Sequence, residues 1–253
     1  MKQAEITLSV VSHGLIQLLA ALLQDLATHC RETSLDVILT LNVPEELPAS
    51  LGQLPYPLQV LRNTTPLGFG ENHNRAFQHA KAPFFCVINP DIRIASDIFQ
   101  VLMDGMENPA VGVVAPLIVN AVGAIEDSAR KFPTPLKILC KLFGGCRGQD
   151  YQIGSVPLEP DWVGGMFMVF RRDTYEGLGG FDQKYFLYYE DVDLCARIRL
   201  KGQRVVMIPG VRATHLARRS SHSSAAYSRM HIRSMVRFFM SMVFAKVMWR
   251  RAR

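Results

Sequence analysis

Short apolar runs of strand length alternate with segments of helical pattern along most of this chain. Such an alternation predicts a mainly parallel β-sheet with helices on both faces, because each helix carries the chain back to the start of the next parallel strand. With 253 residues, 49% of them hydrophobic, the chain is long enough to enclose one large core. We therefore predict an α/β fold with a single sheet. The expected strands cover residues 6–11, 35–41, 58–61, 84–88, 111–119, 161–170 and 205–208.

The remaining segments complete this prediction. Residues 121–154 have no regular pattern and contain five glycines, which predicts a flexible loop over a site. The uncharged stretch 6–23 contains Ser9, Ser12 and His13, so we interpret it as strand, turn and helix rather than as a signal peptide or membrane span. Five cysteines without a CxxC pair argue against a disulfide scaffold or zinc site and favour a reducing, cytosolic environment. Helices are expected at 15–26, 71–80, 172–178 and 190–202.

Polar residues follow three of the predicted strands. Ser12 and His13 come after the first strand, Asn42 after the second and Asp91 shortly after the buried strand 84–88. Parallel sheets bind ligands at the carboxyl ends of their strands. We therefore expect these side chains to lie at one ligand-binding edge.

Two short motifs have both a functional and a structural interpretation. Residues 66–70, Pro-Leu-Gly-Phe-Gly, form a glycine turn that enters a helix, where backbone N–H groups meet phosphate or ribose; the motif is neither a P-loop nor GxGxxG, and such turns are also common without a ligand. Asp91, in Asn89-Pro90-Asp91, has a carboxylate that suits Mg²⁺ when a diphosphate supplies the other ligands, or it simply closes a turn. His215 is either a metal ligand or a polar residue at a strand end.

Three carboxylates stand together at the start of a predicted helix. The helix dipole alone explains acidic residues in a first turn, and Asp193 lies four residues before Arg197, which is the spacing of an ordinary helical ion pair. Glu190 and Asp191 follow an aromatic segment, however, and burial there would raise the pKa of a carboxyl toward the range of a general base. These two residues are the candidates for chemistry.

Charge is divided unevenly along the chain. Residues 194–253 contain 14 Lys and Arg and no Asp or Glu, whereas residues 1–193 contain the other 14 bases and all 22 acids. A basic end of this kind indicates a polyanionic partner, either nucleic acid or an anionic membrane. We predict a domain over 1–223 and a basic amphipathic helical tail over 224–253 that lies in a membrane interface. The alternative is a helix packed on the body or at a homodimer contact.

The order of the motifs resembles the family 2 glycosyltransferases of the GT-A fold. The similarity covers about residues 6–231, and it rests on SHG, GFGxNxNRA, INPD, DWVGGMFMVFRR, GGFDxxYFLYYEDVDLCARIRLKG and THxxxxS. Within this family, SHG, the segment 128–133 and FDQxYFxYxEDxDLC are most similar to bacterial rhamnosyltransferases of O-antigen and related cell-surface polysaccharide synthesis.

This resemblance implies an inverting transfer from a nucleotide sugar, dTDP-L-rhamnose, to a hydroxyl of a lipid-linked saccharide. Asp191 matches the catalytic base, with Glu190 as an acceptor contact. Asp91 matches the metal-binding end of the DxD element, in which Asn89 replaces the first Asp, and His215 matches a late histidine at the metal or diphosphate. The implied cofactor is Mg²⁺ or Mn²⁺.

The resemblance also implies contacts and partners. The nucleotide-sugar contacts would be Ser12, His13, Asn42, Gly68, Asn74, Arg75, Asn89, Asp91 and Gly165, and the acceptor side would be Trp162, Glu190 and Arg130. Many family members have an Asp after the second strand, where this chain has Asn42. The acceptor would be linked to polyprenyl diphosphate, and the protein would lie at the inner face of the cytoplasmic membrane without binding nucleic acid.

Two other classes compete with this interpretation. A nucleotidyltransferase acting on a sugar phosphate would use a similar sheet, a metal-binding Asp and a glycine turn, but it would not need the late EDxD helix. A nucleic-acid-binding protein would use the basic tail to grip phosphates and stack bases. Against this second alternative, the acidic body contains all the motifs.

Overall fold

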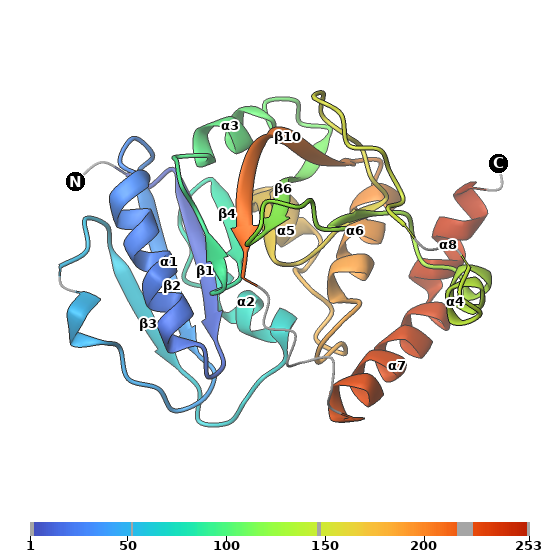
Figure 1. The fold of residues 1–253 in the computed structure, drawn as a ribbon, viewed down its shortest axis with the longest axis horizontal. Helices are drawn as coiled ribbons and strands as arrows, with labels where there is room; N and C mark the ends of the chain where they lie inside the picture. Colours follow the sequence, from blue (N-terminus) through green and yellow to red (C-terminus); the bar gives the residue numbers. More distant parts are fainter. Residues whose placement is uncertain (1–2, 52, 146–147, 217–224, 252–253) are drawn as a thin grey trace.

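The computed structural model describes residues 3–51, 53–145, 148–216 and 225–251, and it contains a central eight-stranded sheet covered by helices (Figure 1). The strand order is β3-β2-β1-β4-β9-β6-β10-β5, and β7 and β8 form a separate small sheet. The strands are β1 (Ile6–Ser12), β2 (Leu35–Leu41), β3 (Leu58–Arg62), β4 (Phe84–Ile88), β5 (Ile92–Arg93), β6 (Val111–Asn120), β7 (Ala129–Arg130), β8 (Trp162–Val163), β9 (Phe167–Arg171) and β10 (Arg204–His215). The helices are α1 (Ile16–His29), α2 (Phe69–Phe77), α3 (Phe99–Asp104), α4 (Pro135–Leu142), α5 (Arg172–Gly177), α6 (Glu190–Leu200), α7 (Ala225–Phe239) and α8 (Met242–Arg251), with a short 3₁₀ turn at Ala49–Leu51.

The prediction of a mainly parallel sheet is confirmed. Strand β1 pairs in parallel with β2 and β4, β2 with β3, and β6 with β10. Strand β9 runs antiparallel between β4 and β6, and β5 runs antiparallel to β10. Because β9 is reversed, its first residue Phe167 pairs with Ile88 at the end of β4. The segment just before β9 therefore lies at the edge where the parallel strands end.

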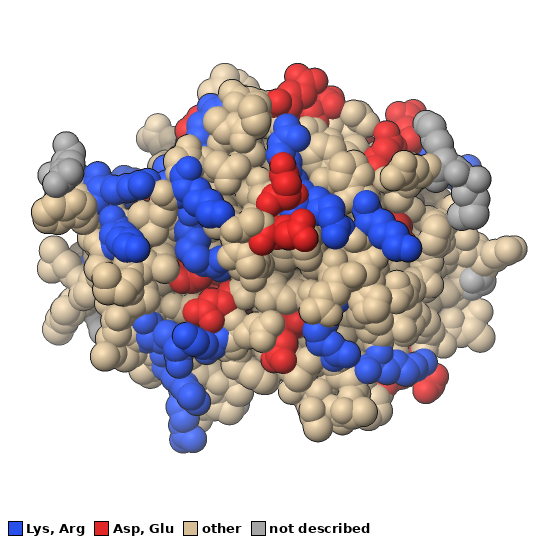
Figure 2. Space-filling view, turned by 180° about the vertical axis from the view of Figure 1, so that it is seen from behind, with Lys and Arg blue, Asp and Glu red and all other residues tan. Residues whose placement is uncertain are grey.

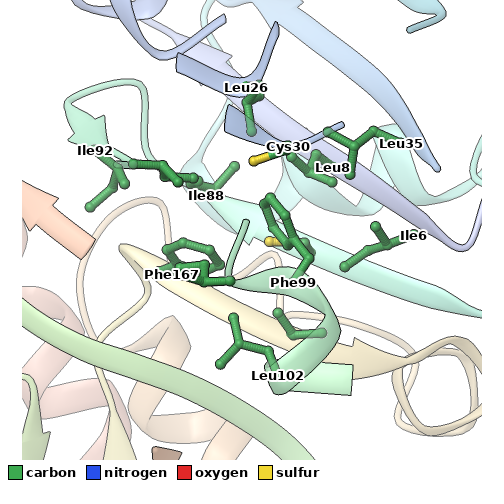
Figure 3. Close-up of a cluster of buried hydrophobic side chains, with 14 of the residues drawn as sticks. Ile6, Leu8, Leu26, Cys30, Leu35, Ile88, Ile92, Phe99, Leu102 and Phe167 are labelled. Carbon is green, nitrogen blue, oxygen red and sulfur yellow. The ribbon is translucent and has the colours of Figure 1, made fainter. Parts of the chain in front are cut away.

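The core lies on both faces of the sheet. One cluster packs β1 and β2 against α1 and α3, and it includes Leu8, Leu26, Phe99 and Phe167 (Figure 3). A second cluster packs the opposite face against α2, α5 and α6. Both faces are buried, which explains why the strands appear in the sequence as continuous apolar runs rather than as alternating patterns.

The structure differs from the predicted elements mainly in the second half of the chain. The single strand expected at 161–170 is two strands, β8 and β9, separated by Gly164 and Gly165. The segment 121–154, expected to be an irregular loop, contains β7 and α4. Strand β10 extends beyond the predicted end at Ile208. The register of its pairing with β6 shifts between Ile208 and Arg212, and the two strands then pair again from Arg212 to His215. The short elements β5 and α3 were not predicted.

The C-terminal segment differs from the expected tail. It forms two helices rather than one, and α8 begins after Ser241, whose hydroxyl accepts a hydrogen bond from the Phe244 amide at 3.1 Å. Phe238 and Val247 are buried and belong to one cluster with Tyr189 of the aromatic segment. The helices α7 and α8 are therefore packed on the body. The predicted boundary between 223 and 224 lies outside the described residues.

The described cysteines are of two kinds. Cys30, Cys86 and Cys195 are buried free thiols, whereas Cys140 is disulfide-bonded, a bond that the cysteine spacing does not predict. Among the described residues, none of the helices has both the length and the apolar character needed to cross a bilayer.

Candidate active site

A strained aromatic turn leads into helix α6 and positions the first two of its three acidic residues. Tyr188 and Tyr189 both have left-handed backbone conformations, with φ of 70° and 68°. Residues other than glycine rarely adopt this region, and each such residue costs about 1–3 kcal/mol, so the surrounding contacts hold the turn in place. The turn places Glu190 and Asp191 in the first turn of α6.

The carboxylate of Asp191 is fixed from two sides. Its Oδ2 atom accepts a hydrogen bond from the Gly165 amide at 2.9 Å, and its Oδ1 atom accepts one from the Val192 amide at 2.8 Å. Burial raises the pKa of Asp191, while these two amides and the charge of Arg130 oppose the rise; the pKa stays above its usual range. A carboxylate that is held in place and has a raised pKa is suited to accept a proton.

Glu190 has a different environment from its neighbour. Its side chain is buried, and its Oε2 atom has no hydrogen-bond partner among the described residues. Burial and the adjacent charge of Asp191 raise the pKa of Glu190 well above its usual range. The two adjacent carboxyls thus have different surroundings, since Asp191 accepts backbone hydrogen bonds and the Oε2 atom of Glu190 accepts none from the described residues, and different surroundings allow adjacent carboxyls to acquire separate roles.

Two of the predicted glycines allow the 67–70 turn to approach this aromatic segment. The Phe69 amide donates a hydrogen bond to the Phe186 carbonyl at 2.8 Å, and a Cβ atom on Gly68 would lie only 2.8 Å from the same oxygen. A Cβ atom on Gly165 would lie 3.3 Å from the Phe69 ring and 3.6 Å from the Cβ of Asp191. The glycines thus bring the GFG turn, the segment before β9 and the aromatic turn before α6 into contact.

A network of side-chain amides lies at the ends of β1, β2 and β3. The Asn42 Oδ1 atom accepts hydrogen bonds from the Leu67 amide at 2.8 Å and from Asn63 Nδ2 at 2.7 Å, and Asn42 Nδ2 lies 3.0 Å from His13 Nδ1. The Ser12 hydroxyl donates to Glu45 at 3.0 Å. The structure therefore brings Ser12, His13 and Asn42 to one edge, as the sequence predicts.

Asn63 is a member of this network that sequence reasoning missed. It follows β3 as Asn42 follows β2, so the same rule on strand ends would have found it. Its Nδ2 atom also donates to Asn72, and its Oδ1 atom accepts from Arg75, another predicted residue. Beside Asn63 lies a cavity of about 340 Å³. It is lined by Leu41, Val43, Pro44, Glu45, Glu46, Arg62 and Asn63.

Asn74 lies in a structural contact, away from the amide network. Its Oδ1 atom accepts hydrogen bonds from the Phe181 amide at 3.0 Å and the Tyr175 hydroxyl at 2.7 Å, and its Nδ2 atom donates to the Phe181 carbonyl at 2.8 Å. Both ends of the amide are engaged by the 179–181 turn. Asn74 therefore joins α2 to the segment before the aromatic turn and has no amide atom free for a nucleotide.

The predicted metal ligands Asp91 and His215 lie side by side. The Nε2 atom of His215 is 3.3 Å from Asp91 Oδ2, and its Nδ1 atom is 2.8 Å from Glu126 Oε2, a residue the sequence analysis missed. Burial alone would lower the pKa of His215, but the two carboxylates raise it to about 9. Among the described residues, no group of three or more His, Cys, Asp or Glu side chains has the arrangement of a metal site.

The predicted acceptor-side residues Arg130 and Trp162 are paired across β7 and β8. The guanidinium of Arg130 lies 5.6 Å from the centre of the Trp162 ring, and its Nε atom is 3.0 Å from Asp127 Oδ2. The charge of Arg130 acts on Asp191 and Tyr189. The small second sheet thus holds one cation near the acidic pair of α6.

Comparison with known proteins assigns the family. Residues 40–236 match the family described as "Glycosyltransferase like family 2". The chain is 30% identical over 184 residues to the rhamnosyltransferase WbbL of Escherichia coli, a match that covers 68% of this chain and 69% of that protein. It is 27% identical over 180 residues to the N-acetylglucosaminyl-diphospho-decaprenol L-rhamnosyltransferase of Mycobacterium tuberculosis, covering 67% of this chain and 58% of that protein.

A solved structure supports the fold assignment. The mannosyltransferase PcManGT from Pyrobaculum calidifontis, in complex with GDP-Man and Mn²⁺, superimposes with a TM-score of 0.65 at 16% identity over 97% of this chain and 70% of that one. The fold is therefore the GT-A glycosyltransferase fold, as predicted. The chain belongs to the family 2 glycosyltransferases and resembles the rhamnosyltransferases among them.

The contact at Gly68 makes a testable prediction. The variant Gly68→Ala should lower the free energy of unfolding by about 1–3 kcal/mol, because the new methyl group meets the Phe186 backbone rather than a movable side chain. Gly154→Ala is the matched control, since nothing lies within 4 Å of its Cβ position. Urea unfolding measures both changes. Equal stability of the two variants would contradict the close approach of the two turns.

Proposed function

We propose that this chain transfers L-rhamnose from dTDP-L-rhamnose to a hydroxyl of a polyprenyl-diphosphate-linked saccharide, with inversion at the anomeric carbon. The observation that carries this proposal is the acidic pair on α6, in which Asp191 is held by the Gly165 amide beside a buried Glu190. The names of the two relatives support the sugar and the type of acceptor. The matched segments span 69% and 58% of the lengths of these two relatives, so the rhamnose donor and the lipid-linked acceptor are proposed for this chain by similarity.

Asp191 is the proposed general base. Its carboxylate takes the proton of the acceptor hydroxyl while the hydroxyl oxygen forms a bond to the anomeric carbon. The bond from that carbon to the diphosphate oxygen breaks, and the nucleoside diphosphate leaves with the electron pair. A positioned base of this kind contributes about 10²–10⁴-fold. A single displacement needs one such carboxylate, unlike the pair used by a retaining glycosidase.

Residues around Asp191 orient the acceptor. A protonated Glu190 donates a hydrogen bond to an acceptor hydroxyl, which agrees with the raised pKa of its carboxyl. Trp162 presents a ring to the apolar face of a sugar, and Arg130, stacked on that ring, lowers the pKa of Asp191 so that more of the base is ionised. These roles keep Arg130, Trp162 and Glu190 on the acceptor side.

The nucleotide part of the donor is proposed to lie along the edge formed by β1 to β4. Asn63 lines the cavity of about 340 Å³ there, which has room for a base, and its Nδ2 atom donates a hydrogen bond to Asn42 at 2.7 Å. Amide side chains offer both a donor and an acceptor to a base edge. Asn42 stands where many family members have an Asp after their second strand, and it positions Asn63 and the Leu67 backbone beside the base, because both ends of its own amide are already hydrogen-bonded.

Asp91 is suited to hold Mg²⁺ or Mn²⁺ together with diphosphate oxygens. His215 is protonated at neutral pH, because the two carboxylates raise its pKa to about 9, so it would join the ligands only after losing that proton. The Oδ1 atom of Asp91 is buried without a hydrogen-bond partner among the described residues, and such an atom is open to a cation. Glu126 holds the other ring nitrogen of His215, so that Nε2 faces Asp91. When bound, the cation would offset negative charge on the departing diphosphate. Asn89 contributes no charge, so Asp91 is the main anionic ligand.

The first test concerns the base. The variant Asp191→Asn should lower kcat by about 10² or more, because it removes the proton acceptor and little volume. The assay follows release of dTDP from dTDP-L-rhamnose with a lipid diphosphate-linked N-acetylglucosamine as acceptor. The exposed Asp173→Asn variant is the control and should retain the parent rate. A kcat for Asp191→Asn within a few-fold of the parent value would exclude Asp191 as the base.

The pH profile tests the role of Arg130. The base works in its ionised form, so kcat/KM should rise with pH through the raised pKa of Asp191. Because the charge of Arg130 lowers that pKa, Arg130→Gln should move the rising limb to higher pH. The exposed Lys184→Gln variant should leave the limb in place. A shift of the same size in both variants would show that Arg130 does not act on the base.

Binding of dTDP tests the metal site without turnover. In calorimetry, Mn²⁺ should tighten the binding of dTDP to the parent, and Asp91→Asn should remove about tenfold or more of that gain, because the cation loses its main carboxylate. The exposed Asp104→Asn variant should keep the full gain. Nucleotide affinity that does not respond to EDTA in the parent would overturn the metal assignment.

A further inference from the structure

The outer face of α7 combines apolar side chains with arginines. Ile232 and Val236 are 56% and 45% exposed and stand four residues apart on one side of the helix, and Met240, just after the last residue of α7, is 83% exposed. We call these three side chains the apolar stripe. Arg229 and Arg233 are exposed beside this stripe. The stripe lies away from Phe238, the buried residue through which α7 packs on the body.

Helix α8 also carries exposed apolar and basic side chains. Met242 and Trp249 are 71% and 63% exposed, and they lie two helical turns apart on one face. Lys246 and Arg250 are exposed next to them. Seen from behind, the side of the molecule that carries α7 and α8 shows Lys and Arg with few acidic side chains, whereas elsewhere on this face Lys and Arg stand among Asp and Glu (Figure 2).

Helix α4 extends the apolar part of the surface. Leu136, Leu139 and Phe143 are 78%, 50% and 86% exposed at positions i, i+3 and i+7. The chain leading into α4 contacts the end of α8, because the guanidinium of Arg251 lies 5.5 Å from the centre of the Phe132 ring. All three helices lie at the same end of the molecule (Figure 1). We call their exposed faces the C-terminal face.

The positive charge of this face favours an anionic partner. Residues 194–253 contain no Asp or Glu, so a two-fold dimer through α7 and α8 would bring arginine stripes against each other. An anionic lipid surface attracts each base by about 1 kcal/mol and also takes up exposed apolar side chains between the bases. We propose that the C-terminal face docks on an anionic lipid bilayer, with α4, α7 and α8 contacting it together.

Helix α7 contacts the aromatic turn that precedes the acidic pair. The His231 ring of α7 is 5.1 Å and 5.4 Å from the rings of Tyr188 and Tyr189, and the Ser234 hydroxyl donates to the Leu187 carbonyl at 2.8 Å. Docking would therefore hold the turn before Glu190 close to the bilayer. Delivery of a lipid-linked acceptor to that turn rests on the proposed function, whereas docking itself does not.

Flotation of the purified protein with vesicles tests the electrostatic part. Binding to vesicles of phosphatidylcholine with phosphatidylglycerol should be strong and should weaken in high salt, whereas phosphatidylcholine alone should bind weakly. The double variant Arg229→Gln/Arg233→Gln should weaken binding roughly 30-fold. The control Arg31→Gln/Lys81→Gln removes the same charge from exposed positions elsewhere and should bind like the parent.

A second pair of variants tests the apolar part. Ile232→Ser/Val236→Ser should weaken binding about tenfold or more, because the stripe no longer enters the interface. The control Val122→Ser/Val156→Ser changes two residues that are 87% and 71% exposed outside the C-terminal face, and it should bind like the parent. Thermal unfolding of each variant confirms that the fold is kept.

Two outcomes would overturn the proposal. One is that both pairs of α7 variants bind vesicles as tightly as their controls. The other is that they change a dimer into a monomer in light scattering while vesicle binding stays constant, which would make this face a contact between two copies. Flotation uses no sugar nucleotide, so its failure is distinct from a failure of the proposed transfer reaction.

Discussion

The hydrogen bond from the Gly165 amide to the Asp191 carboxylate connects the central sheet to the helix that bears the acidic pair. On the sheet side, the next residue, Met166, accepts a hydrogen bond from the Asn89 amide at 2.9 Å, two residues before Asp91. The proposed base and the proposed metal ligand are thus held by adjacent residues of one short segment. Their relative position is set by backbone groups, which move less than side chains do.

The strained turn before α6 explains how two neighbouring carboxyls come to differ. A helix that began with ordinary backbone angles would leave both of them in a solvated first turn. The left-handed Tyr188 and Tyr189 instead send Glu190 into the interior, and Asp191 faces the amide of Gly165. The cost of this conformation is offset by the packing of the aromatic rings against His231 and Phe238 of α7. The C-terminal helices therefore support the site even though none of their residues is proposed to react.

Much of this arrangement could be predicted from the sequence, and the failures have physical causes. The bounds of β2 and β4 are those predicted, because both are continuous apolar runs that end at turn residues. Asn42 could be placed at the ligand edge because it directly follows β2, and the carboxyl ends of parallel strands meet at that edge. Glu126 was missed because it meets His215 across 89 residues of chain, a pairing that no local pattern carries. Packing of the C-terminal segment on the body was only the alternative to a membrane tail, because the many basic residues gave no sign that Phe238 and Val247 are buried against the body.

The reversal of β9 has a consequence for the chemistry of the ligand edge. Parallel strands such as β1 and β4 end at this edge, whereas β9 runs the other way and begins there. The two glycines before β9 therefore lie at the edge, where the Gly164 amide donates to the Ser128 carbonyl at 2.8 Å and the Gly165 amide donates to Asp191. One antiparallel strand in a mainly parallel sheet thus brings a backbone donor to the carboxylate that is proposed to accept the proton.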